Sequence, residues 1–269
     1  MPFTPIRTER LILRQATSDD AAALADRRSD PEVARFQNWT IPYPLERAQA
    51  MVDEVAAMEG PENDEWWMAT VCDAGTNEIL GDLALHLTSE GRTAEVGYTF
   101  STRHWGKGYA VEALAALVEY LFEELGVTRV FAMLHPDNSA SAMVLERSGF
   151  LYEGRTRSSF WLDGEVSDDL IYGLTRPDWE KWRDRKQHPP ERIEFIPVTV
   201  ENQLDVWRLK THKSQEEFVA PMEWSFIDAL FPAVVDGAPL VPWMRVVIAD
   251  DEYVGFVMLA MVTEHHSEP

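Results

Sequence analysis

A short glycine segment between a strand pattern and a helix pattern most constrains how this chain can fold. Residues 93–101 alternate apolar and polar side chains, and residues 111–125 repeat apolar side chains at helical spacing. Gly106-Lys107-Gly108 stands between them. Glycines let the backbone approach a ligand closely, and the first amides of a helix have no partner within it. The order strand, glycine turn, helix therefore predicts an anion site, with a plain glycine turn as the alternative.

Two common phosphate motifs do not fit this segment. A P-loop requires Ser or Thr after the lysine and another glycine five positions before the second one, but Gly108 follows Lys107 and Ser101 stands at the earlier position. A dinucleotide-binding fingerprint requires a third small residue, and Val111 occupies its place. Neither a P-loop nucleotidase nor a dinucleotide-dependent enzyme is expected.

Strand and helix patterns alternate on both sides of the glycine segment. Strands are predicted over residues 10–14, 66–71, 79–87, 93–101, 128–134, 150–153 and 170–174. Helices are predicted over residues 17–28, 44–60, 111–125 and 138–149. This order predicts a mixed α/β fold.

Charge and composition limit the partners of the chain. The net charge of −22 disfavours nucleic acid and anionic membranes, which bind Lys and Arg clusters. An acidic surface could attract cationic amines, or it could serve solubility alone. Cys72 is the single cysteine, no apolar run has the length of a membrane span, and the first residues have no secretory pattern. These features predict a cytoplasmic protein.

Three motifs resemble those of the GNAT superfamily of N-acetyltransferases. Residues 105–113 are similar to its cofactor motif, in which Gln or Arg is followed by x-x-Gly-x-Gly or Ala; Trp105 takes the Gln/Arg place, as is usual in the branch that acetylates ribosomal-protein N-termini. Residues 138–150 resemble its second motif, and Thr8–Arg14 its opening strand in that branch. The matches keep the family's order and span about residues 6–175.

The resemblance implies a fold and a co-substrate. The fold is a mixed, twisted sheet with helices on both faces, split between its fourth and fifth strands. Acetyl-CoA would enter this split, with its pantetheine arm along residues 94–101 and its pyrophosphate at the amides of residues 106–110. No metal is implied. The implied cofactor-binding residues are Phe100, Trp105, Gly106, Lys107, Gly108, Tyr109, Ala110 and Asn138. Asn138 could equally be a helix cap, and Phe100 a core aromatic.

Acetyl transfer to an amine needs a base and a proton donor for the leaving thiolate. Glu95 is the candidate base, because related enzymes carry a carboxylate on this strand; an ordinary strand carboxylate facing solvent or pairing with Arg92 is the alternative. Ser141 is the candidate donor by its place in the second motif, with Tyr152 as runner-up. As a first-turn helix serine, Ser141 could instead bond local backbone.

An aromatic-rich segment between the first two helices matches the acceptor side of the family. The candidate substrate-contacting residues are Phe36, Trp39 and Tyr43, since aromatic faces attract amines; core packing is the alternative for each. The expected acceptor is a small amine or a peptide N-terminus. Phe160 stands where the ribosomal-protein branch carries a base glutamate, which argues against a ribosomal-protein acceptor. A non-catalytic acyl-CoA-binding or regulatory module is the alternative function.

The domain prediction places the acetyltransferase in residues 1–178, a charged linker in 179–192 and a smaller unit in 193–269. Residues 176–192 are expected to form a short helix and then an extended tether. The smaller unit repeats the opening order of strand, helices and hairpin, and residues 215–221 and 254–259 resemble the polyamine acetyltransferase branch. No Gly-x-Gly segment follows. We therefore expect a partial GNAT-like domain without a cofactor motif, which leans on the first domain or on another copy of the chain in a homodimer.

Overall fold

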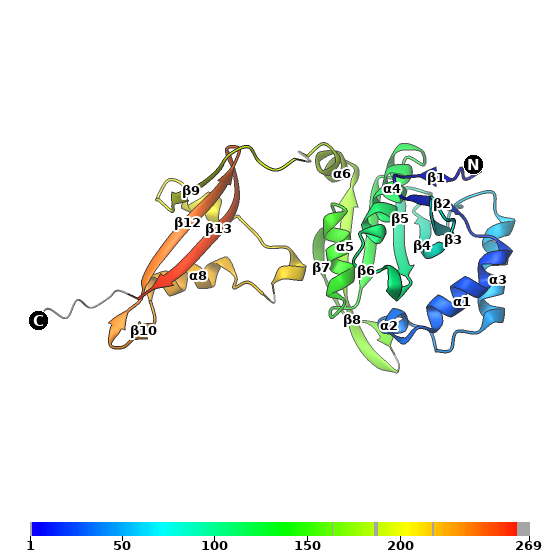
Figure 1. The fold of residues 1–269 in the computed structure, drawn as a ribbon, viewed down its shortest axis with the longest axis horizontal. Coiled ribbons are helices and arrows are strands. Elements are labelled where there is room, and N and C mark those ends of the chain that lie inside the picture. Colours follow the sequence, from blue (N-terminus) through cyan, green and yellow to red (C-terminus); the bar gives the residue numbers. More distant parts are fainter. Residues whose placement is uncertain (1, 163, 186–187, 217, 263–269) are drawn as a thin grey trace, which may run out of the picture. The chain divides into compact units, whose positions relative to one another are not determined.

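The computed structural model describes residues 2–162, 164–185, 188–216 and 218–262. The chain forms two compact units, Met1–Asp184 and Arg185–Pro269 (Figure 1). Asp163 in the predicted turn before Gly164, residues 186–187 in the predicted linker, and residues 263–269 lie outside the described residues. No helix in the described ranges combines the length and apolar composition needed to cross a membrane.

The first unit is built on one eight-stranded sheet in the order β1-β2-β3-β4-β5-β6-β8-β7. Its strands are β1 (Ile6–Arg7), β2 (Leu11–Gln15), β3 (Trp66–Asp73), β4 (Ile79–Thr88), β5 (Thr93–Phe100), β6 (Arg129–Leu134), β7 (Leu151–Leu162) and β8 (Glu165–Thr175). All neighbouring strands pair antiparallel except β5 and β6, which pair parallel. The predicted mixed sheet is confirmed.

Six α-helices accompany this sheet. They are α1 (Ala21–Ser29), α2 (Pro31–Ala34), α3 (Leu45–Ala57), α4 (Tyr109–Glu123), α5 (Ser139–Arg147) and α6 (Arg176–Arg183). A 3-10 turn over Ser18–Asp20 precedes α1, and the Thr17 and Asp20 side chains form the capping box that the sequence cluster predicts. The helices predicted at 17–28, 44–60, 111–125 and 138–149 correspond to α1, α3, α4 and α5.

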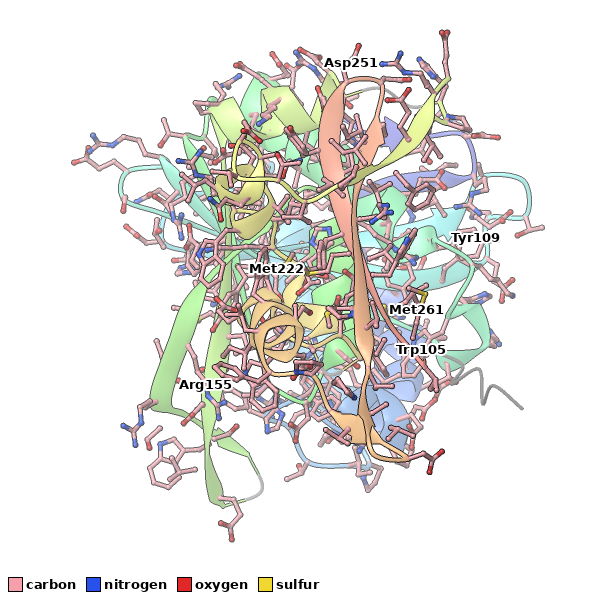
Figure 2. All side chains as sticks on the ribbon, turned by 90° about the vertical axis from the view of Figure 1, so that its left-hand side faces the viewer. Trp105, Tyr109, Arg155, Met222, Asp251 and Met261 are labelled. Atoms are coloured by element: carbon pink, nitrogen blue, oxygen red, sulfur yellow. The ribbon has the colours of Figure 1, made fainter. Side chains whose placement is uncertain are left out.

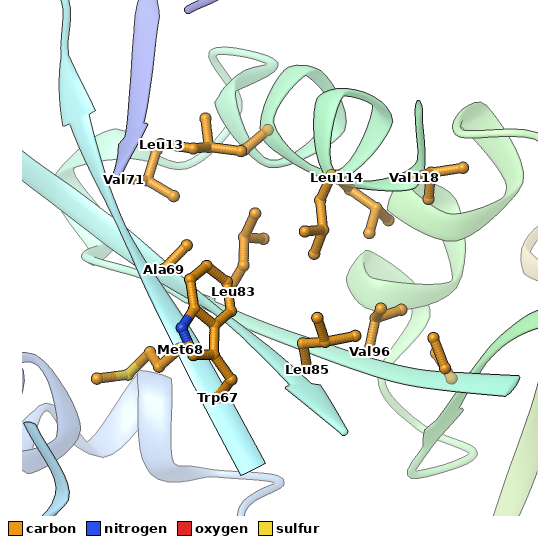
Figure 3. Close-up of a cluster of buried hydrophobic side chains, with 14 of the residues drawn as sticks. Leu13, Trp67, Met68, Ala69, Val71, Leu83, Leu85, Val96, Leu114 and Val118 are labelled. Atoms are coloured by element: carbon orange, nitrogen blue, oxygen red, sulfur yellow. The ribbon is translucent and has the colours of Figure 1, made fainter. Parts of the chain in front are cut away.

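The two faces of the sheet differ because side chains alternate along each strand. Leu83, Leu85 and Val96 lie under Leu114 and Val118 of α4 (Figure 3). All five are buried, at 3% exposure or less. On the other face, Asp82 of β4 bonds Arg27 of α1, and both side chains are buried. Thus α4 covers the apolar face, while α1 is held to the opposite face by an ion pair.

The sheet opens between β5 and β6. These strands pair only where residues 93–95 lie beside residues 129–131. From Val96 to Phe100, β5 remains paired with β4 but has no partner on its β6 side. The predicted split between the fourth and fifth strands is therefore present, with β5 and β6 in those places, and it leaves backbone groups of β5 facing a gap.

The boundary of the first unit differs from the predicted one. Helix α6 belongs to the first unit, because Trp179 is buried and its ring lies 5.1 Å from that of Phe122. Trp182 of the same helix packs against Gly149. The predicted boundary at residue 178 falls within this helix, and the short helix that the sequence predicts at the start of residues 176–192 packs on the first unit. The compact unit ends at Asp184.

The second unit has a three-stranded antiparallel sheet in the order β13-β12-β9. Its elements are β9 (Ile193–Pro197), α7 (Gln203–Trp207), α8 (Met222–Leu230), the short β10 (Val234–Val235) and β11 (Ala238–Pro239), β12 (Val241–Ala249) and β13 (Glu252–Met261). Asp251 lies in the turn of the β12–β13 hairpin and Met261 at its other end (Figure 2). Among its described residues, the buried apolar side chains are Val206 and Val246.

Candidate active site

The glycine segment forms an open turn at the start of α4. Gly106 and Gly108 both have left-handed backbone conformations, with φ of +73° and +80°, which only glycine adopts without strain. Gly108 is the N-cap residue, and its carbonyl accepts the first helical hydrogen bond from Glu112 N at 3.1 Å. The amides of Tyr109, Ala110 and Val111 come before this bond, so they have no partner within the helix. The turn therefore presents free donors at the positive end of α4.

The connection between β1 and β2, residues 8–10, fastens this turn to the sheet. Arg10 Nε donates to Glu112 Oε2 at 2.6 Å, and Thr8 Oγ1 donates to Glu112 Oε1 at 2.5 Å. Arg10 Nη1 also donates to the carbonyl of Lys107 at 2.9 Å, and its guanidinium lies 4.7 Å from the centre of the Tyr109 ring. The resemblance at Thr8–Arg14 thus has a physical role, because these side chains hold the glycine turn in place.

The first cavity lies beside this turn and has a volume of about 440 Å³. Its lining includes Phe100, Trp105, Gly106, Gly108, Tyr109, Ala110 and Asn138. Trp105 Nε1 donates to the carbonyl of Phe100 at 2.8 Å, which joins the end of β5 to the turn. Of the predicted cofactor residues, only Lys107 is not part of the lining; its carbonyl is bound by Arg10. The remaining seven are brought together.

The second cavity lies on the α1 side of β5 and has a volume of about 320 Å³. Its acidic lining residues are Asp82, Glu95 and Asp169. Its aromatic lining residues are Phe36, Trp39, Trp66, Tyr98 and Phe160. Arg28 and His135 line it as well. The combination of carboxylates and aromatic rings suits a cationic amine.

The two cavities share six lining residues. These are Phe36, Gln37, Tyr98, Thr99, Asn138 and Ser141. The Tyr98 hydroxyl donates to the Ser141 carbonyl at 2.9 Å, and Ser141 Oγ lies 2.8 Å from Tyr98 Oη, a contact in which either oxygen can be the donor. Burial raises the pKa of the Tyr98 hydroxyl, and the hydrogen bond with Ser141 only partly offsets this. Tyr98 is therefore protonated at neutral pH.

Asn138 has the structural role that the sequence left open. Its Oδ1 accepts from Ser141 N at 3.1 Å, so it caps α5. It also lines both cavities. The cap fixes the first turn of α5, and this turn places the Ser141 hydroxyl at the junction of the cavities.

Glu95 lines the second cavity and is half-buried. Burial raises its pKa, the charge of Asp169 raises it further, and His86 opposes the change. The alternative pairing with Arg92 does not occur, since Arg92 Nη2 bonds Glu90 Oε2 at 2.8 Å. A carboxylate with a raised pKa is a better proton acceptor than an exposed one.

Three predicted site residues lie outside both cavities: Lys107, Tyr43 and Tyr152. Tyr43 is buried at 3% exposure, and its hydroxyl accepts from Arg28 Nη1 at 3.1 Å. Tyr43 thus holds Arg28, which lines the second cavity. Tyr152 of β7 packs against Tyr172, with ring centres 5.7 Å apart, and is absent from either lining. Ser141, the first candidate for the proton donor, lines both cavities.

Sequence reasoning missed three residues of this site: Arg28, Tyr98 and Asp169. In the sequence, Tyr98 fits the strand alternation and resembles a core aromatic. The glycine beside it, Gly97, indicates that another group can approach the backbone of this strand closely. Asp169 ends a polar stretch without local periodicity, and it accepts from Ser159 Oγ at 2.8 Å. Arg28 lies at the end of α1, and no spacing links it to the glycine segment. Tertiary packing alone brings the three together.

Comparison with known proteins agrees with this geometry. A model of the family described as "Acetyltransferase (GNAT) domain" matches residues 10–151. The chain is 34% identical over 176 residues to the uncharacterized N-acetyltransferase YoaA of Bacillus subtilis (strain 168), covering 65% of this chain and 98% of that protein. It is 26% identical over 192 residues to the [ribosomal protein uS5]-alanine N-acetyltransferase of Escherichia coli (strain K12), covering 68% and 96%.

The fold comparison points the same way. The crystal structure of a GNAT-family acetyltransferase from Bacillus anthracis superposes with a TM-score of 0.58 at 26% identity, covering 64% of this chain and 98% of that one. The family match ends at residue 151, so a GNAT-like origin of the second unit stays a prediction. The open sheet, the glycine turn and the three ordered motifs are those of one family, and the chain belongs to the GNAT acetyltransferases.

Proposed function

We propose that the first unit transfers the acetyl group of acetyl-CoA to a primary amine of a small molecule or a peptide N-terminus, by direct attack. The observation that carries this proposal is the meeting of the two cavities at Tyr98 and Ser141. One cavity ends at a turn with free amides, and the other contains a half-buried carboxylate. Acetyl-CoA in one cavity and the amine in the other can therefore approach the same point from opposite sides.

The first cavity fits acetyl-CoA. Free amides at the start of α4 suit the pyrophosphate, and the unpaired edge of β5 from Val96 to Phe100 suits the amide groups of the pantetheine arm. Gly106 would meet no atom within 4 Å if it carried a Cβ, so the turn is open on its outer side. Acetyl-CoA supplies the acetyl group as a thioester, and the chain supplies its position and the proton transfers.

Glu95 is the proposed base. A free alkylamine has a pKa near about 10, so it arrives as an ammonium and must lose a proton before it attacks. Glu95 and Asp169 attract the ammonium to the second cavity, and Glu95 accepts its proton. Asp169 is buried at 7% exposure, and its Oδ2 already accepts from Ser159, which leaves Glu95 as the freer carboxylate.

Ser141 is the proposed donor to the leaving thiolate, with Tyr98 behind it. As the new C–N bond forms and the C–S bond breaks, the Ser141 hydroxyl gives its proton to sulfur and takes one from Tyr98. The Tyr98 hydroxyl is neutral at physiological pH because burial raises its pKa. The nitrogen loses two protons on the way from ammonium to amide: Glu95 takes the first, and the second leaves to solvent as the tetrahedral intermediate collapses. The proton taken by Glu95 returns to Tyr98 through solvent, so the cycle balances with one net proton released.

Direct attack is favoured over a cysteine acyl-enzyme. Cys72 is the only cysteine of the chain, and its side chain is 0% exposed. Burial raises the pKa of its thiol, with smaller opposing effects from Arg14. A buried neutral thiol is a poor nucleophile, and Cys72 lines neither cavity.

The test is an acetylation screen with acetyl-CoA and a panel of polyamines, aminoglycosides, amino acids and peptide N-termini, read by release of free CoA and by product mass. Transfer to at least one amine supports the proposal. Tight acetyl-CoA binding without transfer to any member would contradict it and would favour a non-catalytic acyl-CoA-binding module.

A further inference from the structure

Arg28 is a buried cation on the wall of the second cavity. It is the second-last residue of α1 and is 8% exposed, yet it is one of the lining residues. Burying a guanidinium is costly unless its charge and its donors are satisfied. The partners of this side chain therefore indicate whether the site is complete without a ligand.

The protein satisfies only one part of the Arg28 guanidinium. Nη1 donates to Tyr43 Oη at 3.1 Å, and the group stacks on the rings of Trp39 and Tyr43 at 4.5 and 5.1 Å from their centres. Nε is buried without a hydrogen-bond partner among the described residues. Nη2 also has no hydrogen bond in this part of the chain. Nε is enclosed by protein atoms, so Nη2 is the unpaired donor that a ligand carboxylate in the cavity can reach with a charge-assisted hydrogen bond.

The adjacent arginine shows the contrast. Arg27 bonds Asp82 through both Nε and Nη2, and Asp82 also accepts from Thr99 Oγ1 at 2.7 Å. Asp82 is thereby occupied, although it lines the same cavity. No carboxylate of the described residues forms a salt bridge with Arg28. Among the described residues, Arg28 therefore lacks a bonded counter-ion, and the cavity that it lines is where a ligand carboxylate can supply one.

We propose that Arg28 binds a carboxylate of the acceptor, so the substrate is an amino-acid-like molecule with both an amine and a carboxylate. This inference rests on the proposed function of the cavity. The acidic residues Glu95 and Asp169 receive the amine, and Arg28 receives the opposite charge. The volume of about 320 Å³ is at the small end of the range for ligand pockets, about 300 to 1,000 Å³, and suits a small zwitterion.

The experiment uses the full chain and matched acceptors. The panel consists of the standard α-amino acids, β-alanine and 4-aminobutyrate, each beside its carboxamide. We expect wild-type kcat/KM to favour the best carboxylate over its carboxamide by at least about tenfold. Arg28→Gln should bring this ratio close to one. Arg28→Lys should lose most of the preference, because an ammonium cannot keep the planar stack on Trp39 and Tyr43 while it donates to the ligand.

Arg47→Gln is the matched control, since Arg47 stacks on the same Tyr43 ring at 5.4 Å but lines neither cavity. It should keep the wild-type ratio. Acetyl-CoA affinity by calorimetry reports whether each variant is folded. A purely structural role of Arg28 would lower activity towards both members of a pair and leave their ratio unchanged, which overturns the proposal.

Calorimetric titration of the same amino acids into CoA-loaded protein separates this inference from the proposed function. Arg28-dependent binding without acetylation would uphold the carboxylate site and contradict the transferase. Acetylation without a carboxylate preference would uphold the transferase and overturn the carboxylate site. Absence of both binding and acetylation of every carboxylate in the panel would also overturn it.

Discussion

The Tyr98 hydroxyl lies 2.8 Å from the Ser141 hydroxyl oxygen, across the place where β5 and β6 separate. Ser141 is in the first turn of α5, which Asn138 caps, and Tyr98 is on the unpaired part of β5. The bond therefore joins the two sides of the open sheet at the junction of the cavities. It also gives Ser141, the predicted donor, a second group that can replace its proton.

Replacing Tyr98 should slow the chemical step more than it weakens binding. Tyr98→Phe keeps the ring but removes the proton behind Ser141, and general acid catalysis is worth about 10²- to 10⁴-fold. We expect kcat to fall by at least the lower figure while acetyl-CoA affinity stays close to wild type. Tyr152→Phe tests the alternative donor in the same assay. A larger loss in Tyr152→Phe than in Tyr98→Phe would contradict the assignment.

Replacing Gly108 should weaken the pyrophosphate site. Its φ of +80° is strained for any residue with a Cβ. That Cβ would lie 3.4 Å from Nη2 of Arg10, the side chain whose hydrogen bonds hold the turn. Gly108→Val should weaken acetyl-CoA binding at least tenfold, about 1.4 kcal/mol, in calorimetry. Gly91→Val carries similar backbone strain, with φ of +75°, but lies outside both cavities. Equal affinities in the two variants would mean that Gly108 does not form the site.

Glu112 should make stability depend on pH. Burial would raise its pKa, but hydrogen bonds from Thr8 and Arg10 and the Arg10 charge outweigh it and lower the pKa below 4.5. Its stabilisation is therefore present above pH 4.5 and is lost as pH falls through the lowered value. Glu112→Gln should lower the free energy of unfolding by about 1 kcal/mol at pH 7.

The measurement is urea unfolding of wild type and Glu112→Gln at pH 7 and at decreasing pH. The difference between them should shrink below pH 4.5. Glu119→Gln is the control, since Glu119 is an exposed residue of the same helix. A difference in unfolding free energy that stays constant at acid pH, or an equal loss of stability in Glu119→Gln, would refute the stabilising role of the hydrogen bonds from Thr8 and Arg10 to Glu112.

The fold was predictable where apolar periodicity or glycine marks an element. β5, the glycine turn and α4 appeared within a few residues of their true bounds. The outer parts of β7 and β8 were not predicted, because the residues around Arg155 do not alternate between apolar and polar side chains (Figure 2). Helix α6 (Arg176–Arg183) corresponds to the short helix that the sequence predicts at the start of residues 176–192. Its packing on the first unit was missed because the segment is highly charged, although Trp179 and Trp182, three residues apart, were a signal of one buried face.

The site was predictable only in its motif residues. The glycines, Trp105 and Ser141 lie in segments that the family resemblance covers, and Glu95 lies on the strand before them. Arg28 and Asp169 come from other elements, α1 and β8, and meet Glu95 only through tertiary packing. No local pattern reports which strand edge or helix end will line a cavity.

The second unit should not contribute to the first active site. Both cavities are lined by residues of the first unit alone. A chain of residues 1–184, which retains α6, should therefore bind acetyl-CoA as the full chain does. The second unit exposes large apolar side chains such as Trp224 and Phe231, so its removal should change solubility or oligomeric state instead. Lost binding in a shortened chain with native circular dichroism would contradict this division.

The central claim is that Glu95 accepts the proton of the amine. Glu95→Gln removes the base and keeps the shape, and Glu90→Gln, an exposed neighbour beyond the same strand, is the control. The decisive measurement is kcat/KM against pH for wild type and both variants, with acetyl-CoA affinity measured in parallel. In wild type, burial raises the pKa of Glu95, so activity should fall in acid with a midpoint above 4.5. Glu95→Gln should lose about 10²-fold or more in kcat/KM and lack this acid limb, with unchanged acetyl-CoA affinity. Wild-type turnover and an unchanged pH profile in Glu95→Gln would contradict the account.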